Sequence, residues 1–114
     1  MTTIYGIKNC DTVKKALKWL DQAGVNYTFH DFRVQGFDQV LWQEFTAKID
    51  WQNLINKRST SYRNLDDEIK QNLNIDNATE AVLEQPTLIK RPVLIHNAQL
   101  HLGFKAADYQ AIFA

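Results

Sequence analysis

Cys10 is the only cysteine in this 114-residue chain, and it stands where the apolar pattern changes. Thr3 to Ile7 is typical of a short buried strand, and the apolar residues after Cys10 recur with helical spacing. Asn9 is a suitable N-cap for that helix, so the thiol is predicted in its first turn. Backbone N–H groups there lack partners and, with the helix dipole, favour a thiolate. The pattern therefore indicates a reactive thiol.

A second interpretation of Cys10 is burial, because a free cysteine often acts as a small hydrophobe. Cys10 precedes Val13 by three residues, so it shares the phase of the apolar stripe and burial stays open. A C-x-x-C motif that begins at Cys10 would need a second cysteine at position 13, and that residue is Val13. Because the chain has no other cysteine, no intramolecular disulfide can form. An external thiol must resolve any intermediate on Cys10, and glutathione is the expected one.

Lys90-Arg91-Pro92 directly precedes an apolar segment that begins at Val93. A proline that leads a strand occupies a restricted position, and X-Pro bonds are the ones that adopt the cis form. Arg91 and Lys8 are cations that would stabilise a nearby thiolate. The other interpretation is an edge-strand proline beside two solvated charges.

The first third of the chain predicts a strand–helix–strand unit. Val13, Ala16, Leu17 and Leu20 form the apolar stripe of the helix, and Gly24 is expected to end it. A second strand is predicted from Tyr27 to Phe32. Tight connections of this kind favour parallel strands and a right-handed crossover.

The middle of the chain is predicted to be helical. Asp38 can cap a helix with Val40, Leu41, Phe45 and Ile49 on its apolar face, and Asp50 can cap a shorter turn through Trp51, Leu54 and Ile55. Asn77 and Glu80 resemble a capping box for a helix that Pro86 ends.

The last part of the chain predicts two strands and a helix. Val93–His96 and Leu100–Leu102 flank Asn97-Ala98 as in a hairpin, and Tyr109, Ile112 and Phe113 mark a short amphipathic helix. The element order predicts an α/β, thioredoxin-like fold: a four-stranded mixed sheet flanked by helices. We expect one domain over residues 1–114, with a helical insertion at about residues 37–85.

Composition excludes several classes of protein. Thirteen Lys and Arg residues balance thirteen Asp and Glu residues, so no overall field attracts nucleic acid or an anionic membrane. No secretory signal or membrane span is recognisable, and a single cysteine fits a reducing compartment, so the expected location is the cytoplasm. His30, His96 and His101 lack metal-site spacing, so no metal is expected. Trp19, Trp42 and Trp51 are expected to pack in or beside the core.

Four segments together resemble the ArsC/Spx superfamily of arsenate reductase-like proteins, and most of all its YffB-like branch. They are Tyr5 to Thr12, Ile55 to Thr60, Lys90-Arg91-Pro92 and Leu102-Gly103-Phe104. The resemblance implies a thioredoxin fold, a nucleophilic Cys10, and a cis Pro92 preceded by an arginine, Arg91, that faces the thiol. It also implies a glutathione-dependent thiol reductase, with Lys8, Arg58 and Pro92 in substrate binding and no bound cofactor. The expected state is a monomer.

The chain departs from the arsenate reductases of this superfamily at two positions. The resemblance implies an oxyanion-binding arginine in the insertion and another after the last strand, but Asn56 and Gly103 stand near those places. Arsenate reduction is therefore an alternative function. A second alternative is an Spx-like regulator that docks on RNA polymerase, although this chain lacks the C-x-x-C switch of that branch.

Overall fold

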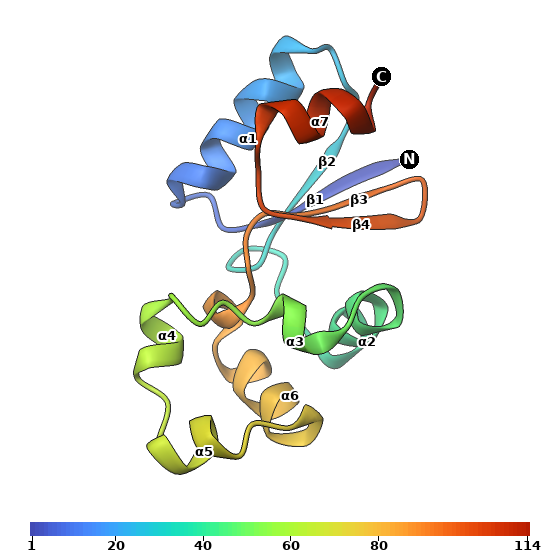
Figure 1. The fold of residues 1–114 in the computed structure, drawn as a ribbon. Helices are drawn as coiled ribbons and strands as arrows, with labels where there is room; N and C mark the ends of the chain where they lie inside the picture. The colour runs from blue at the N-terminus through green and yellow to red at the C-terminus, as the bar shows by residue number, and fades with distance from the viewer. The chain divides into compact units, whose positions relative to one another are not determined.

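The first strand, β1 (Thr2–Gly6), is paired on both sides in the computed structural model, which describes residues 1–114. It runs parallel to β2 (Thr28–Asp31) and antiparallel to β3 (Val93–His96), and β3 pairs with β4 (Gln99–Leu102). The strand order is β2-β1-β3-β4. Because α1 (Asp11–Gln22) connects the parallel pair, the predicted strand–helix–strand unit is confirmed, and the fold is the expected thioredoxin-like α/β sheet with flanking helices (Figure 1).

The chain separates into two units. The sheet unit comprises Met1–Gly36 and Arg91–Ala114, and the helical unit comprises Phe37–Lys90. Inside the helical unit, Ile89 forms an antiparallel backbone bridge with Ile55.

The core of the sheet unit lies between one face of the sheet and two helices. Ile4 and Leu94 are register partners on β1 and β3, so their side chains point to the same face. Leu20 of α1 and Tyr109 of α7 (Ala106–Ile112) are buried in one cluster with them. Figure 1 shows α1 and α7 against the same side of the sheet, as this shared cluster requires.

Helix α1 confirms the predicted apolar stripe. Val13, Ala16 and Leu20 are fully buried, and the lysines between them are exposed. The helix ends before Gly24, whose φ of 70° lies in the left-handed region that glycine enters without steric cost. The apolar period of this segment therefore predicts the buried face of the helix, and Gly24 predicts its end.

Tyr109 is the centre of an aromatic cluster at one end of this core. The ring centroids of Trp19, Phe104 and Phe113 lie 5.6, 4.8 and 6.1 Å from that of Tyr109. The hydroxyl group is buried without a hydrogen-bond partner. Burial raises the pKa of Tyr109 far above its ordinary value, since a phenolate would lose its hydration. This tyrosine is therefore a neutral core residue.

The predicted hairpin is also confirmed. β3 and β4 are joined by Asn97 and Ala98, which adopt φ values of 50° and 67°. Two consecutive residues with positive φ match the turn whose twist suits a two-residue hairpin. The Met1 carbonyl accepts a hydrogen bond from Asn97 N–H at 3.2 Å, so the turn also holds the first residue of the chain.

Short helices make up the helical unit. They are α2 (Gln39–Lys48), α3 (Trp51–Leu54), α4 (Thr60–Arg63), α5 (Asp67–Gln71), α6 (Ile75–Glu84) and the 3-10 turn η1 (Pro86–Leu88). Side chains at the N-caps of α2, α3, α4 and α6 accept hydrogen bonds from the first turn, and these caps are Asp38, Asp50, Ser59 and Asn74. The predicted caps Asp38 and Asp50 are confirmed.

Some details of the helical unit differ from the sequence-based predictions. The capping box of α6 joins Asn74 to Asn77, not Asn77 to Glu80, because the Asn74 and Asn77 side chains each accept from the other's backbone N–H, at 3.0 and 2.8 Å. Val40 is 73% exposed, and Trp42 with Phe45 forms the buried face of α2 instead. Helices α4 and α5 bury no residue, so no apolar period marks them in the sequence.

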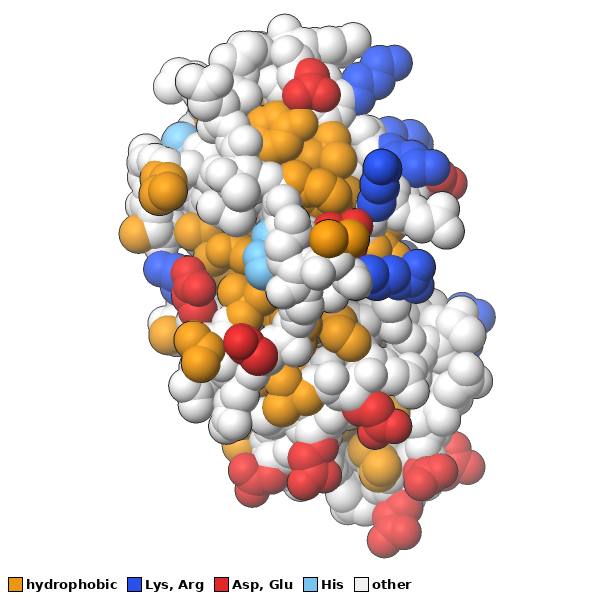
Figure 2. Space-filling view, turned by 180° about the vertical axis from the view of Figure 1, so that it is seen from behind, with side chains coloured by type: hydrophobic (Ala, Val, Ile, Leu, Met, Phe, Trp, Pro, Cys, Tyr) orange, Lys and Arg blue, Asp and Glu red, His pale blue; other side chains and the backbone are white.

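Charge is distributed unevenly between the two units. Cations outnumber carboxylates in the sheet unit, where the carboxylates are Asp11, Asp21, Asp31 and Asp108, whereas carboxylates outnumber cations in the helical unit. In Figure 2 most of the visible Lys and Arg side chains lie along one side of the face, at the right of the view, and fewer lie on the opposite side. The neutral total charge therefore hides a locally positive sheet unit. None of the helices has the length and apolar character that crossing a membrane requires.

Candidate active site

Cys10 is the N-cap residue of α1. Its backbone is extended, with φ of −133° and ψ of 124°, and its carbonyl accepts the first helical hydrogen bond from Lys14 N–H at 2.9 Å. The sequence-based prediction of Asn9 as the cap is therefore wrong by one residue, because Lys8 and Asn9 form the turn that leads into the helix. Cys10 is half-buried as a residue, so it is not part of the fully buried core.

The N–H groups in the first turn of α1 donate no hydrogen bond to the side chain of the N-cap residue. The Cys10 sulfur makes no capping hydrogen bond, in contrast to the oxygen caps of the helical unit. The free N–H groups of this turn, together with the positive end of the helix dipole, favour an anion at the cap position. Asp11 in the same turn is exposed, so water screens its charge. The first turn of α1 is therefore open to an anion beside Cys10.

Asp31 anchors the loop that carries Cys10. Its carboxylate is buried at the end of β2 and accepts hydrogen bonds from Lys8 N–H at 3.2 Å and from Arg33 N–H at 2.8 Å. The Gly6 carbonyl accepts from Phe32 N–H at 2.8 Å in the same region. Asp31 is absent from the sequence-based candidates; its signal is a carboxylate within Tyr27–Phe32, the segment predicted as a strand. Its hydrogen bonds hold the loop in position.

Gly6 sets the approach of β1 to α1. A Cβ atom at this position would lie 2.8 Å from Val13 Cγ2, closer than real Cβ contacts. Val13 is fully buried and stands one turn after Cys10. The missing side chain of Gly6 therefore lets the first turn of α1 pack directly on the strand before it.

Arg91 and Pro92 leave the sheet at the same end as the Cys10 loop. Tyr5 is paired with Val93 in the antiparallel register, so the residues after β1 lie beside the residues before β3. The Arg91–Pro92 peptide bond is cis, Pro92 is buried, and Arg91 is half-buried and forms no ion pair. The sheet thus brings the predicted Cys10, Arg91 and Pro92 to one end.

The segment after β4 joins the same end of the sheet. Val93 pairs with Leu102, and the Pro92 carbonyl accepts a hydrogen bond from Gly103 N–H at 2.9 Å. Gly103 has a φ of 76°, a conformation that an arginine side chain would disfavour. The position where the resemblance implies a second oxyanion-binding arginine is therefore a turn held by the cis-proline segment.

Lys8 and Arg58 differ in their placement. Lys8 belongs to the loop before Cys10; its backbone is fixed by Asp31, and its side chain is exposed without an ion pair. Arg58 belongs to the helical unit and is not among the residues that the sheet gathers. Its N–H group donates to Asn56 Oδ1 at 3.0 Å, so Asn56 serves to form a turn there.

Two of the three histidines, His30 and His96, have structural partners. His30 Nε2 lies 2.8 Å from the Gly36 carbonyl, and His96 Nδ1 lies 2.7 Å from Thr2 Oγ1. Burial, and secondarily the charge of His96, lowers the pKa of His101 below its usual 6.5. No group of three His, Cys, Asp or Glu side chains is arranged to hold a metal ion.

Known proteins resemble the chain along its whole length. An uncharacterized protein of Haemophilus influenzae is 46% identical over 114 residues, which cover both chains completely. A solved structure called the YFFB protein is 41% identical, covers both chains completely and has a TM-score of 0.92. The solution structure of an arsenate reductase (ArsC) related protein from Brucella melitensis is 44% identical, with a TM-score of 0.82 over 98% of this chain and 93% of that one.

A more distant relative is named as a regulator. The global transcriptional regulator Spx of Streptococcus mutans is 22% identical over 113 residues, which cover 97% of this chain and 82% of that protein. The sequence model of the ArsC family matches residues 5–112, a span that includes Cys10, Arg91, Pro92 and Gly103. The chain therefore belongs to the ArsC family.

Proposed function

We propose that this protein is a glutathione-dependent thiol reductase in which Cys10 is the nucleophile. The Cys10 thiolate attacks one sulfur of a disulfide substrate, a new S–S bond forms to Cys10, and the other sulfur leaves as a thiolate that takes a proton from water. A glutathione thiolate then attacks the sulfur bonded to Cys10. This second step restores the Cys10 thiolate and leaves a mixed disulfide between glutathione and the remaining half of the substrate. A second glutathione thiolate releases that half as a thiol and forms oxidised glutathione, so two glutathione molecules together supply two electrons to the substrate.

The position of Cys10 is the observation that carries this proposal. Cys10 is half-buried at the N-cap of α1 with no hydrogen bond to the first turn, and it belongs to an ArsC-family chain. A thiolate needs access and a positive environment to act as a nucleophile. The lack of any second cysteine supports an external thiol as the reductant.

Arg91, Pro92 and Lys8 have separate roles in this mechanism. Arg91 is a half-buried cation without a carboxylate partner at the sheet end that Cys10 occupies, so it is available to stabilise the thiolate. Pro92 presents backbone beside the site to a peptide-like thiol, and Lys8 is available to a glutathione carboxylate. Arg58 is proposed as a further carboxylate ligand from the helical unit.

The residues favour a sulfur substrate over arsenate. A dianionic oxyanion beside a thiolate brings like charges together, and several guanidinium groups must neutralise them. Asn56 forms a turn with Arg58 N–H, and Gly103 occupies a positive-φ turn. Neither position supplies the arginine that the resemblance implies for arsenate reductases.

Adduct formation with oxidised glutathione tests the proposal. We expect mass spectrometry to find one glutathione on Cys10 of the wild type, removed again by reduced glutathione, and none on Cys10→Ser. Arg91→Gln should form the adduct more slowly, and Arg63→Gln, which removes an exposed cation of the helical unit, should match the wild type. A wild-type protein that forms no adduct would exclude the proposed reaction.

Docking on RNA polymerase is the second candidate function, because one relative is a global transcriptional regulator. A pulldown with purified RNA polymerase separates the two candidates. Recovery of the polymerase by the wild type and by Cys10→Ser alike, together with no adduct in the first experiment, would favour docking. Assay of arsenate in place of oxidised glutathione tests the remaining alternative, with no turnover expected.

A further inference from the structure

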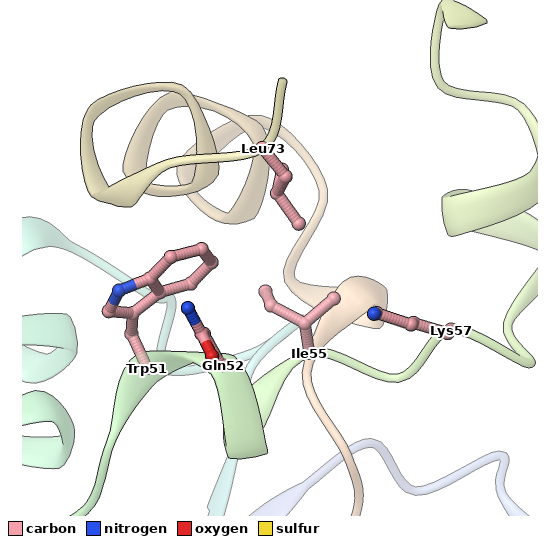
Figure 3. Close-up of a pocket in the computed structure, with 5 residues that line it drawn as sticks. All are labelled: Trp51, Gln52, Ile55, Lys57 and Leu73. Carbon is pink, nitrogen blue, oxygen red and sulfur yellow. The ribbon is translucent and has the colours of Figure 1, made fainter. Parts of the chain in front are cut away.

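The helical unit contains a pocket that the proposed thiol chemistry does not use. It is lined by Trp51, Gln52, Ile55, Lys57 and Leu73. Figure 3 shows the benzene part of the Trp51 indole, the Ile55 side chain and the Leu73 side chain directed toward one shared space. Three apolar side chains therefore form walls that fit an apolar group.

The polar groups of the pocket favour an anion. In Figure 3 the Lys57 ammonium group is directed toward Ile55, and the Gln52 amide stands between Trp51 and Ile55. Lys57 forms no ion pair, the Gln52 side chain has no hydrogen-bond partner, and no carboxylate lines the pocket. An ammonium group and an amide N–H group both donate to carboxylate oxygens.

The size of the pocket limits the apolar part of a ligand to one ring. The pocket volume is about 180 Å³, and an apolar cavity of about 150 Å³ is enough to hold benzene. Aromatic rings also pack favourably against an indole. A single benzene-sized ring fits between the apolar walls, with room for a substituent that reaches Lys57.

We propose that this pocket binds a small aromatic carboxylate. The ring occupies the space between Trp51, Ile55 and Leu73, and the carboxylate accepts hydrogen bonds from Lys57 and from the Gln52 amide. Binding at this site involves no residue of the sheet unit, so it is independent of the proposed reaction at Cys10. The combination of an unpaired cation with apolar walls is what selects this class of ligand.

The indole N–H resonances of the three tryptophans provide a direct test. The probe is 3-phenylpropionate, added to ¹⁵N-labelled protein, with the Trp51 resonance assigned through Trp51→Phe. We expect a saturable shift of the Trp51 resonance and none of the Trp19 resonance, since Trp19 belongs to the sheet unit. 3-Phenylpropylamine, which has the same ring and a positive charge, should shift neither resonance.

A matched pair of variants tests the role of Lys57. Lys57→Gln removes the cation from the pocket, and Arg63→Gln removes an exposed cation from the same unit without touching the pocket. We expect binding of 3-phenylpropionate to weaken about tenfold in Lys57→Gln, as for loss of a charged hydrogen bond, and to stay unchanged in Arg63→Gln. An unmoved Trp51 resonance, equal shifts with the amine, or unchanged binding by Lys57→Gln would each overturn the proposal.

Discussion

The three longest helices begin in different ways, and the difference singles out the residue that we propose as the nucleophile. In the helical unit, α2 and α6 begin at Asp38 and Asn74, whose side-chain oxygens accept hydrogen bonds from the first turn. In the sheet unit, α1 begins at Cys10, whose sulfur makes no such bond. An oxygen cap stabilises a helix by about 0.5 to 2 kcal/mol. A cysteine at this position forgoes that stabilisation and leaves the first turn open to an anion.

Exchange of Cys10 for an oxygen cap should have the largest effect. We predict that Cys10→Ser abolishes the glutathione adduct and raises the free energy of unfolding by about 1 kcal/mol, because serine is a favourable N-cap. Cys10→Ala should lose the adduct without the gain in stability. Urea unfolding together with mass spectrometry measures both effects. Equal stabilities of the serine and alanine variants would contradict the comparison of helix starts.

The packing of α1 on β1 provides the next prediction. Gly6→Ala should lower the free energy of unfolding by about 1 to 3 kcal/mol, because its Cβ would meet Val13 Cγ2 at 2.8 Å. Val13→Ala removes that atom, so the double variant should lose less stability than the sum of the two single changes. Urea unfolding of all four proteins gives the coupling. Additive losses would show that this contact does not position α1.

A change at a structural cap should leave the thiol untouched. We predict that Asn74→Ala costs about 1 kcal/mol of unfolding free energy, because it breaks the reciprocal bonds between Asn74 and Asn77. The rate at which Cys10 reacts with oxidised glutathione should equal that of the wild type. Urea unfolding and adduct kinetics provide the two measurements. A slower adduct reaction in Asn74→Ala would mean that the cap of α6 affects the reactivity of Cys10.

The smallest predicted effect is a pH dependence in the sheet unit. Burial lowers the pKa of His101 in the folded state below the ordinary value of 6.5, which applies to the unfolded state. At a pH between the folded-state and unfolded-state pKa, the folded protein therefore binds fewer protons than the unfolded chain. The contribution of His101 to stability is therefore present above pH 6.5 and is lost as pH falls below it. Urea unfolding from about pH 8 to about pH 5 should show a smaller loss for His101→Gln than for the wild type. Identical losses would assign the pH dependence to other groups.

Strong periodicity made much of the sheet unit predictable from the sequence. Val13, Ala16 and Leu20 recur at helical spacing, and Asn97-Ala98 separates two apolar runs, so α1 and the hairpin follow from local pattern. Prediction of Asn9 as the cap failed because cap preference favours asparagine over cysteine, whereas the turn at residues 8 and 9 places the helix start one residue later.

Contacts between distant segments were not predictable in the same way. The role of Asp31 depends on Lys8 N–H, which lies far from it in sequence, so no local pattern announces it. The Asn74 box was missed because two asparagines and a glutamate allow two capping patterns, and only the backbone geometry selects one. Cys10 was singled out by its residue type and position, and Arg91 and Pro92 through the family resemblance; the sheet register places all three at one end of the sheet.

The reactivity of the Cys10 thiol in the folded protein tests most directly whether Cys10, at the N-cap of α1, is a nucleophile. The rate of Cys10 alkylation by iodoacetamide at about pH 7 can be compared between the folded protein and the urea-unfolded chain, which has neither the helix start nor Arg91 in place. The account predicts faster alkylation of the folded protein and a smaller difference in Arg91→Gln. Slower alkylation of the folded protein would show a protected sulfur and contradict the account.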